Sequence, residues 1–169
     1  ITATQPRILE NPIEVVRSQK YMTDDLFNRV KLVRNNEYKN TEEFKVAFPE
    51  IFKGDNCLIV FNKRVPALET HDYFSERIRG FSIFCLTTYL TPKDRNKKIQ
   101  EIRQKIKNVE KMIVIATQLI EAGVDLSFKT VFRDFGPFDS IVQVAGRCHR
   151  NGEYGILGGE MHLLSLGTD

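Results

Sequence analysis

The sequence predicts an α/β domain in which a mostly parallel sheet carries helices on both faces. Short apolar runs that can form strands alternate along the chain with stretches of helical periodicity. The run Cys57–Phe61 is apolar throughout, which is typical of a strand buried on both faces of a parallel sheet. Polar or glycine-bearing loops follow several runs, at the end of the strand where parallel sheets bind ligands.

Composition narrows the class of protein. The 169 residues are enough for one domain, and 41% hydrophobic and 28% charged residues are ordinary for a globular chain. No apolar run approaches the roughly 20 residues of a membrane span, and the first residues lack the pattern of a signal peptide. We therefore expect a cytoplasmic protein. The net charge of +3 permits an anionic partner without requiring one.

The three cysteines, Cys57, Cys85 and Cys148, lie far apart in the sequence. No Cys or His residues have the spacing of a zinc site, so we expect no metal ligands. Cys57 and Cys85 lie in apolar runs and are expected to be small buried hydrophobic residues in a reducing compartment.

The first third of the chain gives the weaker structural signals. The β-branched run Ile13–Val16 predicts a strand. Thr23 can cap a helix over Asp24–Val33, where apolar residues recur at helical spacing. A second helix is expected over Glu42–Phe52, although Pro49 interrupts it.

From Cys57 onward strands and helices alternate clearly. The helix after the first of these strands is expected to end near Arg79, before Gly80. Thr91 and Pro92 fit the cap and first residue of a helix that runs to Lys107. Further strands are expected at Phe81–Leu86, Ile113–Ala116, Thr130–Arg133 and Met161–Leu166, and a helix that begins near Pro137 is expected to contain Arg147.

Polar clusters follow the predicted strands. They are Asn62, Thr87–Thr88, Thr117–Asp125 and Asp134–Asp139. Because the carboxyl ends of parallel strands share one edge of the sheet, we expect these clusters to lie together there. Thr117, Thr87 or Thr88, and the backbone near Phe61 and Asn62 can then donate to nucleic-acid phosphates.

The arginines near the C-terminus are candidates for phosphate chemistry. Arg147 and Arg150 are three residues apart, which on a helix puts them on one face. Forked guanidinium groups can stabilise charge on a transferred phosphoryl group, as an arginine finger does. Asp125 can accept hydrogen bonds from a ribose, and Gly123 and Gly146 permit a close backbone approach. The structural alternative is a pair of arginines that make surface ion pairs.

The complementary parts of a nucleotide site are missing from the sequence. It contains no GxxxxGK[ST] loop and no acidic pair on a strand, so it lacks the phosphate cradle and the Mg²⁺ ligands of a P-loop ATPase. The basic face of the helix that ends at Lys107 is a weaker indication of nucleic-acid contact, because such faces are usually only solvated.

Four segments together resemble a known family. ITATQP resembles helicase motif III, CLIVFNKR motif IV, ATQLIEAGVDL motif V, and QVAGRCHRNG the Q-x-x-G-R-x-x-R motif VI of superfamily 2 helicases. The residues of motifs V and VI, together with the segment LTTYLTPKDR, are similar to those of the CRISPR-associated helicase of type I interference systems, the Cas3 family. DEAD-box helicases typically have A-R-G-x-D and H-R-x-G-R-x-x-R, so Gln118–Asp125 and Gln143 argue against that group.

The resemblance implies the second RecA-like (P-loop NTPase-like) domain of an ATP-dependent motor, over residues 10–169. Residues 1–9 would be the end of motif III and a linker from a first RecA-like domain, so the chain is expected to be part of a longer protein. ATP and Mg²⁺ would be bound mainly by that first domain, and this chain alone would be inactive. The implied partners are single-stranded DNA, the first RecA-like domain, an HD nuclease in cis or as a separate chain, and the guide-RNA surveillance complex.

The resemblance also assigns roles to individual residues. Arg147 and Arg150 would be fingers on the γ-phosphate, supported by Gln143. The residues facing the nucleotide would be Gly123, Asp125 and Gly146. Those gripping DNA would be Phe61, Asn62, Thr87, Thr88, Thr117, Gln118 and Glu121. The alternatives are another superfamily 2 helicase, or a non-catalytic nucleic-acid-binding adaptor that kept the RecA-like fold and has no need of arginine fingers.

Overall fold

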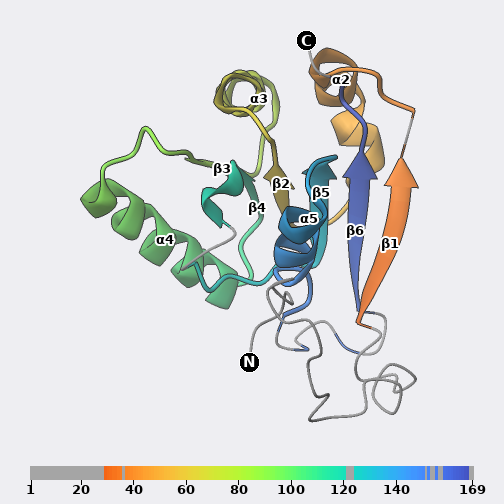
Figure 1. Cartoon of the computed structure of the whole chain (residues 1–169). Coiled ribbons are helices and arrows are strands. Elements are labelled where there is room, and N and C mark those ends of the chain that lie inside the picture. The colour runs from red at the N-terminus through yellow and green to blue at the C-terminus, as the bar shows by residue number, and fades with distance from the viewer. Residues whose placement is uncertain are drawn as a thin grey trace, which may run out of the picture.

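A computed structural model describes residues 29–35, 37–120, 124–150, 152, 155 and 158–167. These residues form a six-stranded, all-parallel sheet with the strand order β1-β6-β5-β2-β4-β3, as in RecA-like domains (Figure 1). The strands are β1 (Val30–Asn35), β2 (Asn56–Val60), β3 (Ser82–Leu86), β4 (Met112–Ala116), β5 (Thr130–Asp134) and β6 (Gly159–Leu164). The helices are α2 (Thr41–Ile51), α3 (Arg64–Arg77), α4 (Pro92–Lys107), α5 (Phe138–Ala145) and the short 3-10 helix η1 (Gln118–Ile120). The predicted fold class is confirmed.

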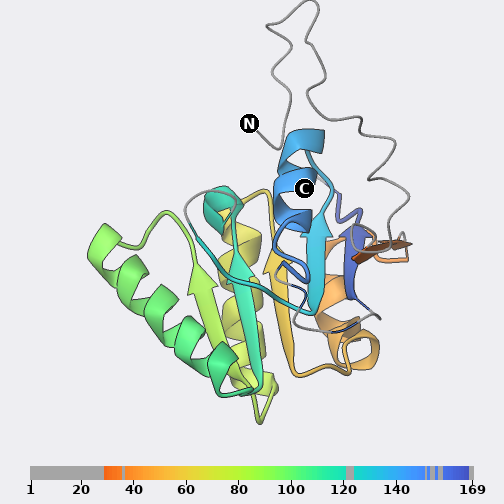
Figure 2. The same ribbon diagram turned by 90° about the horizontal axis from the view of Figure 1, so that it is seen from below.

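Helices cover both faces of the sheet (Figures 1 and 2), and each face has its own hydrophobic core. Helices α2 and α3 pack on one face through aromatic residues, and Phe48 lies with its ring centroid 4.6 Å from that of Phe74. Helices α4 and α5 pack on the other face, where Ile99 and Ile102 of α4 are buried. All five residues of the interior strand β4 are buried, as a strand covered on both faces requires.

Two helices follow the capping and spacing in the sequence. Thr91 caps α4 by accepting a hydrogen bond from the Asp94 amide at 3.2 Å, and Pro92 is the first helical residue. In α2, Phe44 and Phe48 recur at helical spacing and are buried, and Pro49 does not end the helix before Ile51. None of the described helices combines the length and apolarity that a membrane crossing requires.

The helix predicted over Asp24–Val33 is wrong at its C-terminal end. Residues 30–33 belong to β1, which pairs along its whole length with β6. Local spacing favoured a helix, but pairing with a strand about 130 residues away decides the conformation. Residues 24–28 and the strand expected at Ile13–Val16 lie outside the described residues. The last strand, Gly159–Leu164, is shifted two residues toward the N-terminus relative to its prediction.

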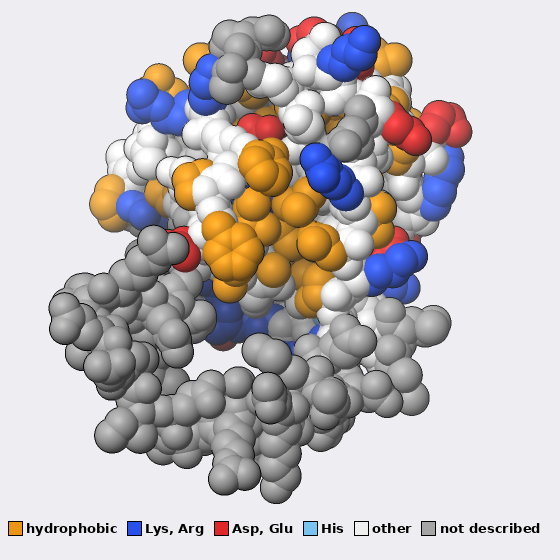
Figure 3. All heavy atoms as spheres, turned by 45° about the vertical axis from the view of Figure 1, so that its right-hand side comes forward, with side chains coloured by type: hydrophobic (Ala, Val, Ile, Leu, Met, Phe, Trp, Pro, Cys, Tyr) orange, Lys and Arg blue, Asp and Glu red, His pale blue; other side chains and the backbone are white. Residues whose placement is uncertain are grey.

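The β1–β6 part of the α4/α5 face is covered less than the rest. Leu32 pairs with Met161 and so shares its face, yet Leu32 is 60% exposed. Phe138, at the start of α5, is 77% exposed. Figure 3 shows hydrophobic side chains gathered on this side of the molecule. The candidate site residues lie elsewhere, at the two ends of the strands.

Candidate nucleotide and nucleic-acid sites

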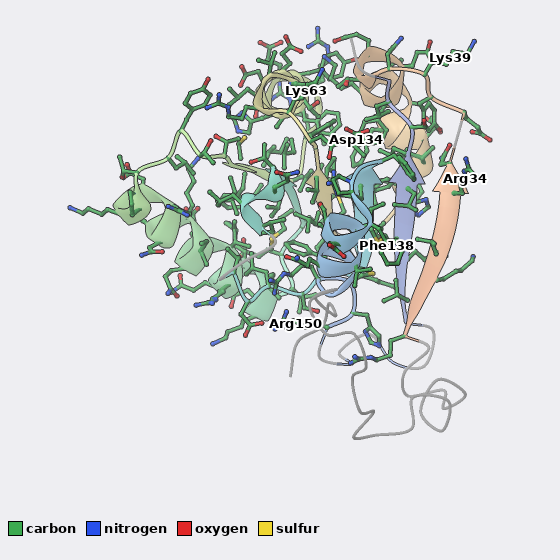
Figure 4. All side chains as sticks on the ribbon, in the orientation of Figure 1. Arg34, Lys39, Lys63, Asp134, Phe138 and Arg150 are labelled. Atoms are coloured by element: carbon green, nitrogen blue, oxygen red, sulfur yellow. The ribbon has the colours of Figure 1, made fainter. Side chains whose placement is uncertain are left out.

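The candidate residues fall into two groups at opposite ends of the sheet. Asn62, Thr87 and Thr117 follow the carboxyl ends of β2, β3 and β4. Together with their neighbours Phe61, Thr88 and Gln118 they form the carboxyl-edge group. Arg147 and Arg150 lie in the segment Gly146–Arg150, the arginine turn, beside Phe128 just before β5. Figure 4 shows this separation, with Lys63 and Asp134 toward the upper end of the sheet and Arg150 at the lower end.

The arginine turn is not helical, so the prediction that its two arginines share one helix face is wrong. Helix α5 ends at Ala145. The Phe128 amide donates to the Arg147 carbonyl at 2.9 Å, and the His149 amide donates to the Phe128 carbonyl at 2.9 Å. The amides of Arg147 and Cys148 still donate to carbonyls of α5, but the parallel bridge between Cys148 and Phe128 ends the helix at this point. His149 then takes a left-handed conformation, with φ of 48°.

The two arginine side chains of the arginine turn differ in their exposure to solvent. Arg147 is buried, with 7% exposure, whereas the Arg150 side chain is 40% exposed. Burial lowers the pKa of Arg147 from its ordinary value, the positive charge of Arg150 lowers it further, and Asp125 opposes both effects. Two neighbouring positive charges favour an added anion, and the exposed part of the Arg150 side chain is accessible to one.

Asp125 holds Arg150 in the present arrangement. Its carboxylate lies 2.9 Å from Arg150 Nε. The Arg150 amide donates to Ser127 Oγ at 3.0 Å, and Arg29 Nη1 donates to the Arg150 carbonyl at 2.9 Å. Asp125 was expected at the carboxyl edge with Thr117, but it pairs with Arg150 in the arginine turn, near the start of β5 at the opposite end of the sheet.

The carboxyl-edge group is only partly exposed. The Phe61 side chain is buried, and its amide donates to the Ala116 carbonyl at 2.9 Å. The Phe61 side chain therefore offers almost no exposed surface at this edge. Thr87 and Thr117 are buried, and the Thr117 amide donates to the Leu86 carbonyl at 3.2 Å. Thr88 and Gln118 are exposed.

Asn62 orders the neighbouring loop through Asp134. Asn62 Nδ2 donates to Asp134 Oδ2 at 2.8 Å and to the Phe135 carbonyl at 2.6 Å. Burial raises the pKa of Asp134, and the hydrogen bonds from Asn62 and near Leu166, with the charge of Arg133, pull it down. A cavity of about 380 Å³ lies beside this pair, between the starts of α2 and α3. Its polar lining includes Asn40, Glu42, Asn62, Lys63, Glu69 and Asp134.

Sequence reasoning missed a buried arginine. Arg133 of β5 has no exposed surface, and its Nη2 donates to Ser140 Oγ at 2.7 Å. Its Nη1 donates to the Val60 carbonyl at 3.4 Å, so one side chain joins β5, the end of β2 and α5. The only signal was an arginine within the apolar strand TVFRD. A buried charge there requires partners, which the structure supplies.

The remaining predicted residues have mixed outcomes. Gln143 is half-buried on α5, and Gly146 is an exposed residue at the end of that helix. Gly123 and Glu121 lie outside the described residues. All three cysteines are buried free thiols, as expected for Cys57 and Cys85, and burial raises the pKa of Cys85 to about 11 and that of Cys148 to about 12. The described residues contain no cluster of three or more potential metal ligands.

Residues 53–153 match the family described as CRISPR-associated nuclease/helicase Cas3, C-terminal. A Cas3 of Haloferax volcanii is 59% identical over 54 residues, which are 32% of this chain and 6% of that protein. The chain spans between 6% and 15% of the length of the curated Cas3 proteins that it matches.

Solved structures share the fold at low sequence identity. The crystal structure of T. fusca Cas3 with AMPPNP superposes with a TM-score of 0.67 at 18% identity, over 83% of this chain and 18% of that one. A chain in a CRISPR RNA-guided surveillance complex in its pre-nicking state superposes with a TM-score of 0.61 at 20% identity, over 82% of this chain and 19% of that one.

Proposed function

Because the chain belongs to the family of CRISPR-associated nuclease/helicase Cas3 C-terminal domains, we propose that it is the second motor domain of an ATP-dependent single-stranded DNA translocase. We assign residues 10–169 to this domain and residues 1–9 to the end of motif III and a linker. The observation that carries the proposal is the arginine turn, where Arg150 pairs with the Asp125 carboxylate and Arg147 lies close enough for the charges of both residues to affect its pKa.

The arginine turn would supply charge to a nucleotide held mainly by a first RecA-like domain. Guanidinium groups fit the γ-phosphate of ATP, and they offer no ligand to Mg²⁺, whose carboxylates we expect from that first domain. Arg150 would exchange the Asp125 carboxylate for the phosphate. An exposed ion pair contributes only about 0–1 kcal/mol, so this exchange costs little. Gln143, Gly123 and Gly146 would support the arginines and approach the nucleotide.

The carboxyl-edge group would hold the DNA. Thr88 and Gln118 are exposed at this edge and, with the backbone near Asn62, would donate to phosphates. The buried Thr87 and Thr117, and the Asn62 side chain through its bonds to Asp134 and Phe135, would fix the loops beneath them. We also assign Glu121 and, through its effect on Asn62, Phe61 to this group. With ATP at one end of the sheet and DNA at the other, closure of the two domains around ATP would change the grip on the strand. ATP binding and hydrolysis would thereby drive translocation.

The biological setting that we propose is type I CRISPR interference in the cytoplasm. Support comes from the Cas3 family and from the similar chain in a CRISPR RNA-guided surveillance complex. The partners would be that complex and an HD nuclease, in cis or as a separate chain. The nuclease would degrade the strand that the motor feeds to it.

The test is ATP hydrolysis with and without single-stranded DNA, in the protein encoded by the full reading frame and in this chain alone. We expect DNA-stimulated turnover in the full protein and none in the chain alone. Turnover by the chain alone would contradict the two-domain mechanism. If the full protein bound DNA but never hydrolysed ATP, a non-catalytic adaptor would be the better description.

A further inference from the structure

A stacked pair of side chains, Arg64 and Tyr89, lies at the carboxyl edge of the sheet. The guanidinium carbon of Arg64 lies 4.7 Å from the centroid of the Tyr89 ring. The ring is nevertheless 64% exposed. Arg64 is the first residue of α3, and Tyr89 follows Thr87 and Thr88 in the loop after β3. The segments that follow β2 and β3 therefore meet at one exposed aromatic residue.

The loop that carries Tyr89 is held on both sides. The Leu90 amide donates to the Thr87 carbonyl at 3.2 Å, and Thr87 is buried. Thr91 caps α4, and its hydroxyl donates to the Asp94 carboxylate at 2.7 Å. The Asp94 carboxylate is thus already hydrogen-bonded within the N-terminal cap of α4. An exposed ring on an anchored loop loses little conformational entropy when a ligand stacks on it.

We propose that Tyr89 is a stacking platform for a nucleobase of single-stranded nucleic acid, with Arg64 supporting the ring. The proposal rests on the proposed function and adds a base contact to its phosphate contacts. Aromatic rings stack on any base, which suits a motor that moves along DNA of any sequence. Arg64 stacks on the ring as a cation, and together with the exposed Lys63 it supplies positive charge for the adjacent phosphates.

The chain contains no tryptophan, which allows a direct test. Tyr89→Trp places a single indole at the platform of the otherwise unchanged chain. We expect its fluorescence to be quenched when oligothymidylate is added, because the base stacks on the indole. An abasic oligonucleotide of the same length provides phosphates without bases, and it should leave the fluorescence unchanged.

The matched control lies at the other end of the same strand. Phe81 precedes β3, and Lys111 Nζ lies 5.8 Å from the centroid of its ring, so it is also an aromatic residue paired with a cation. Phe81→Trp should report no quenching with either oligonucleotide. Quenching at this control as large as at Tyr89→Trp would overturn the platform.

Binding is followed in the same samples by the anisotropy of a labelled oligonucleotide. If DNA binds without quenching Tyr89→Trp, the platform is wrong and the proposed DNA grip stands. If no variant binds DNA, the platform is wrong, and if the full-length protein also fails to bind DNA, the proposed function is wrong as well. Tyr89→Ala should weaken binding about 5- to 150-fold, the effect expected for one lost stacked base, and Tyr89→Phe should bind as the parent does. Equal affinities of the alanine variant and the parent would also refute the platform.

Discussion

Arg133 Nη2 donates a hydrogen bond to Ser140 Oγ at 2.7 Å and ties β5 to the first turn of α5. The same guanidinium group donates to the carbonyl of Val60, one residue before Phe61 and two before Asn62. Helix α5 runs from this tie toward the arginine turn. The buried Arg133 side chain therefore positions α5, the helix that leads from the carboxyl edge of the sheet to the arginine turn.

Replacing Arg133 should destabilise the domain. Arg133→Met keeps much of the volume but leaves the Ser140 hydroxyl and the Val60 carbonyl without this donor, at a cost of about 1–3 kcal/mol for each group left unsatisfied. Urea unfolding measures the change in the free energy of unfolding. Ser140→Ala should cost less, since the charged group keeps its bond to Val60. An Arg133→Met variant as stable as the parent would show that the buried charge contributes nothing.

Gly159 should be essential for the arginine turn. A Cβ at this position would lie 2.5 Å from Cys148 Sγ and 2.9 Å from the Lys129 carbonyl oxygen. In Gly159→Ala, either Cys148 has to move or β6 has to distort, at a cost of about 1–3 kcal/mol. Cys148 lies between the two arginines in the sequence, so its movement would disturb the arginine turn. Reaction of the Cys148 thiol with a thiol reagent reports the movement, because this thiol is buried in the parent.

Gly146→Ala serves as the comparison for this substitution. Its nearest contact would be the Gln143 carbonyl oxygen at 3.3 Å, so a much smaller adjustment suffices. Cys148 should stay protected in this variant. Equal protection of Cys148 in Gly159→Ala and in the parent would contradict the proposed role of Gly159.

Protonation of His162 should lower stability in mildly acidic solution. Burial lowers the pKa of His162 below its ordinary value of 6.5, although Glu160 opposes this effect and Lys31 reinforces it. The unfolded chain then takes up its proton at a higher pH than the folded chain does. Stability is complete above the unfolded pKa and decreases as the pH falls below about 6.5.

The measurement for this prediction is the free energy of unfolding between about pH 7.5 and 5.5, in the parent and in His162→Gln. The parent should lose more stability over this interval than the variant does. Glu160 acts in the same sense but at lower pH: its pKa is lowered, first by the hydrogen bond from Lys31, so its contribution is lost only on stronger acidification. Parallel curves for the two proteins would exclude His162 as the cause.

The sequence predicted elements whose signals are local. Cys57–Phe61 and Ile113–Ala116 are continuous apolar runs, and the cap at Thr91 is contained in a few residues, so both strands and α4 were found almost to the residue. The edge strand β1 was missed because its partner, β6, lies at the other end of the chain. Pairing of this kind leaves no local pattern that distinguishes it from an amphipathic helix.

The candidate residues were found by motif, but their arrangement was not. A spacing of three residues between Arg147 and Arg150 fits a helix, yet a bridge to Phe128, about 20 residues earlier, fixes an extended turn. Asp125 appeared to belong with Thr117, yet it pairs with Arg150 at the opposite end of the sheet, a neighbour that no local pattern reveals. Arg133 was overlooked because a buried charge can be recognised only from its partners.

The central claim is that the arginine turn acts on the nucleotide of a first RecA-like domain. The most direct measurement is the rate of single-stranded-DNA-stimulated ATP hydrolysis by the full-length protein with Arg147→Ala or Arg150→Ala. Arg77→Ala is the control, because Arg77 stacks on Tyr73 in α3, away from the arginine turn. We predict a loss of about 10³-fold in turnover for either arginine of the turn, with DNA binding retained, and no loss for the control. Turnover unchanged in both Arg147→Ala and Arg150→Ala would contradict the claim.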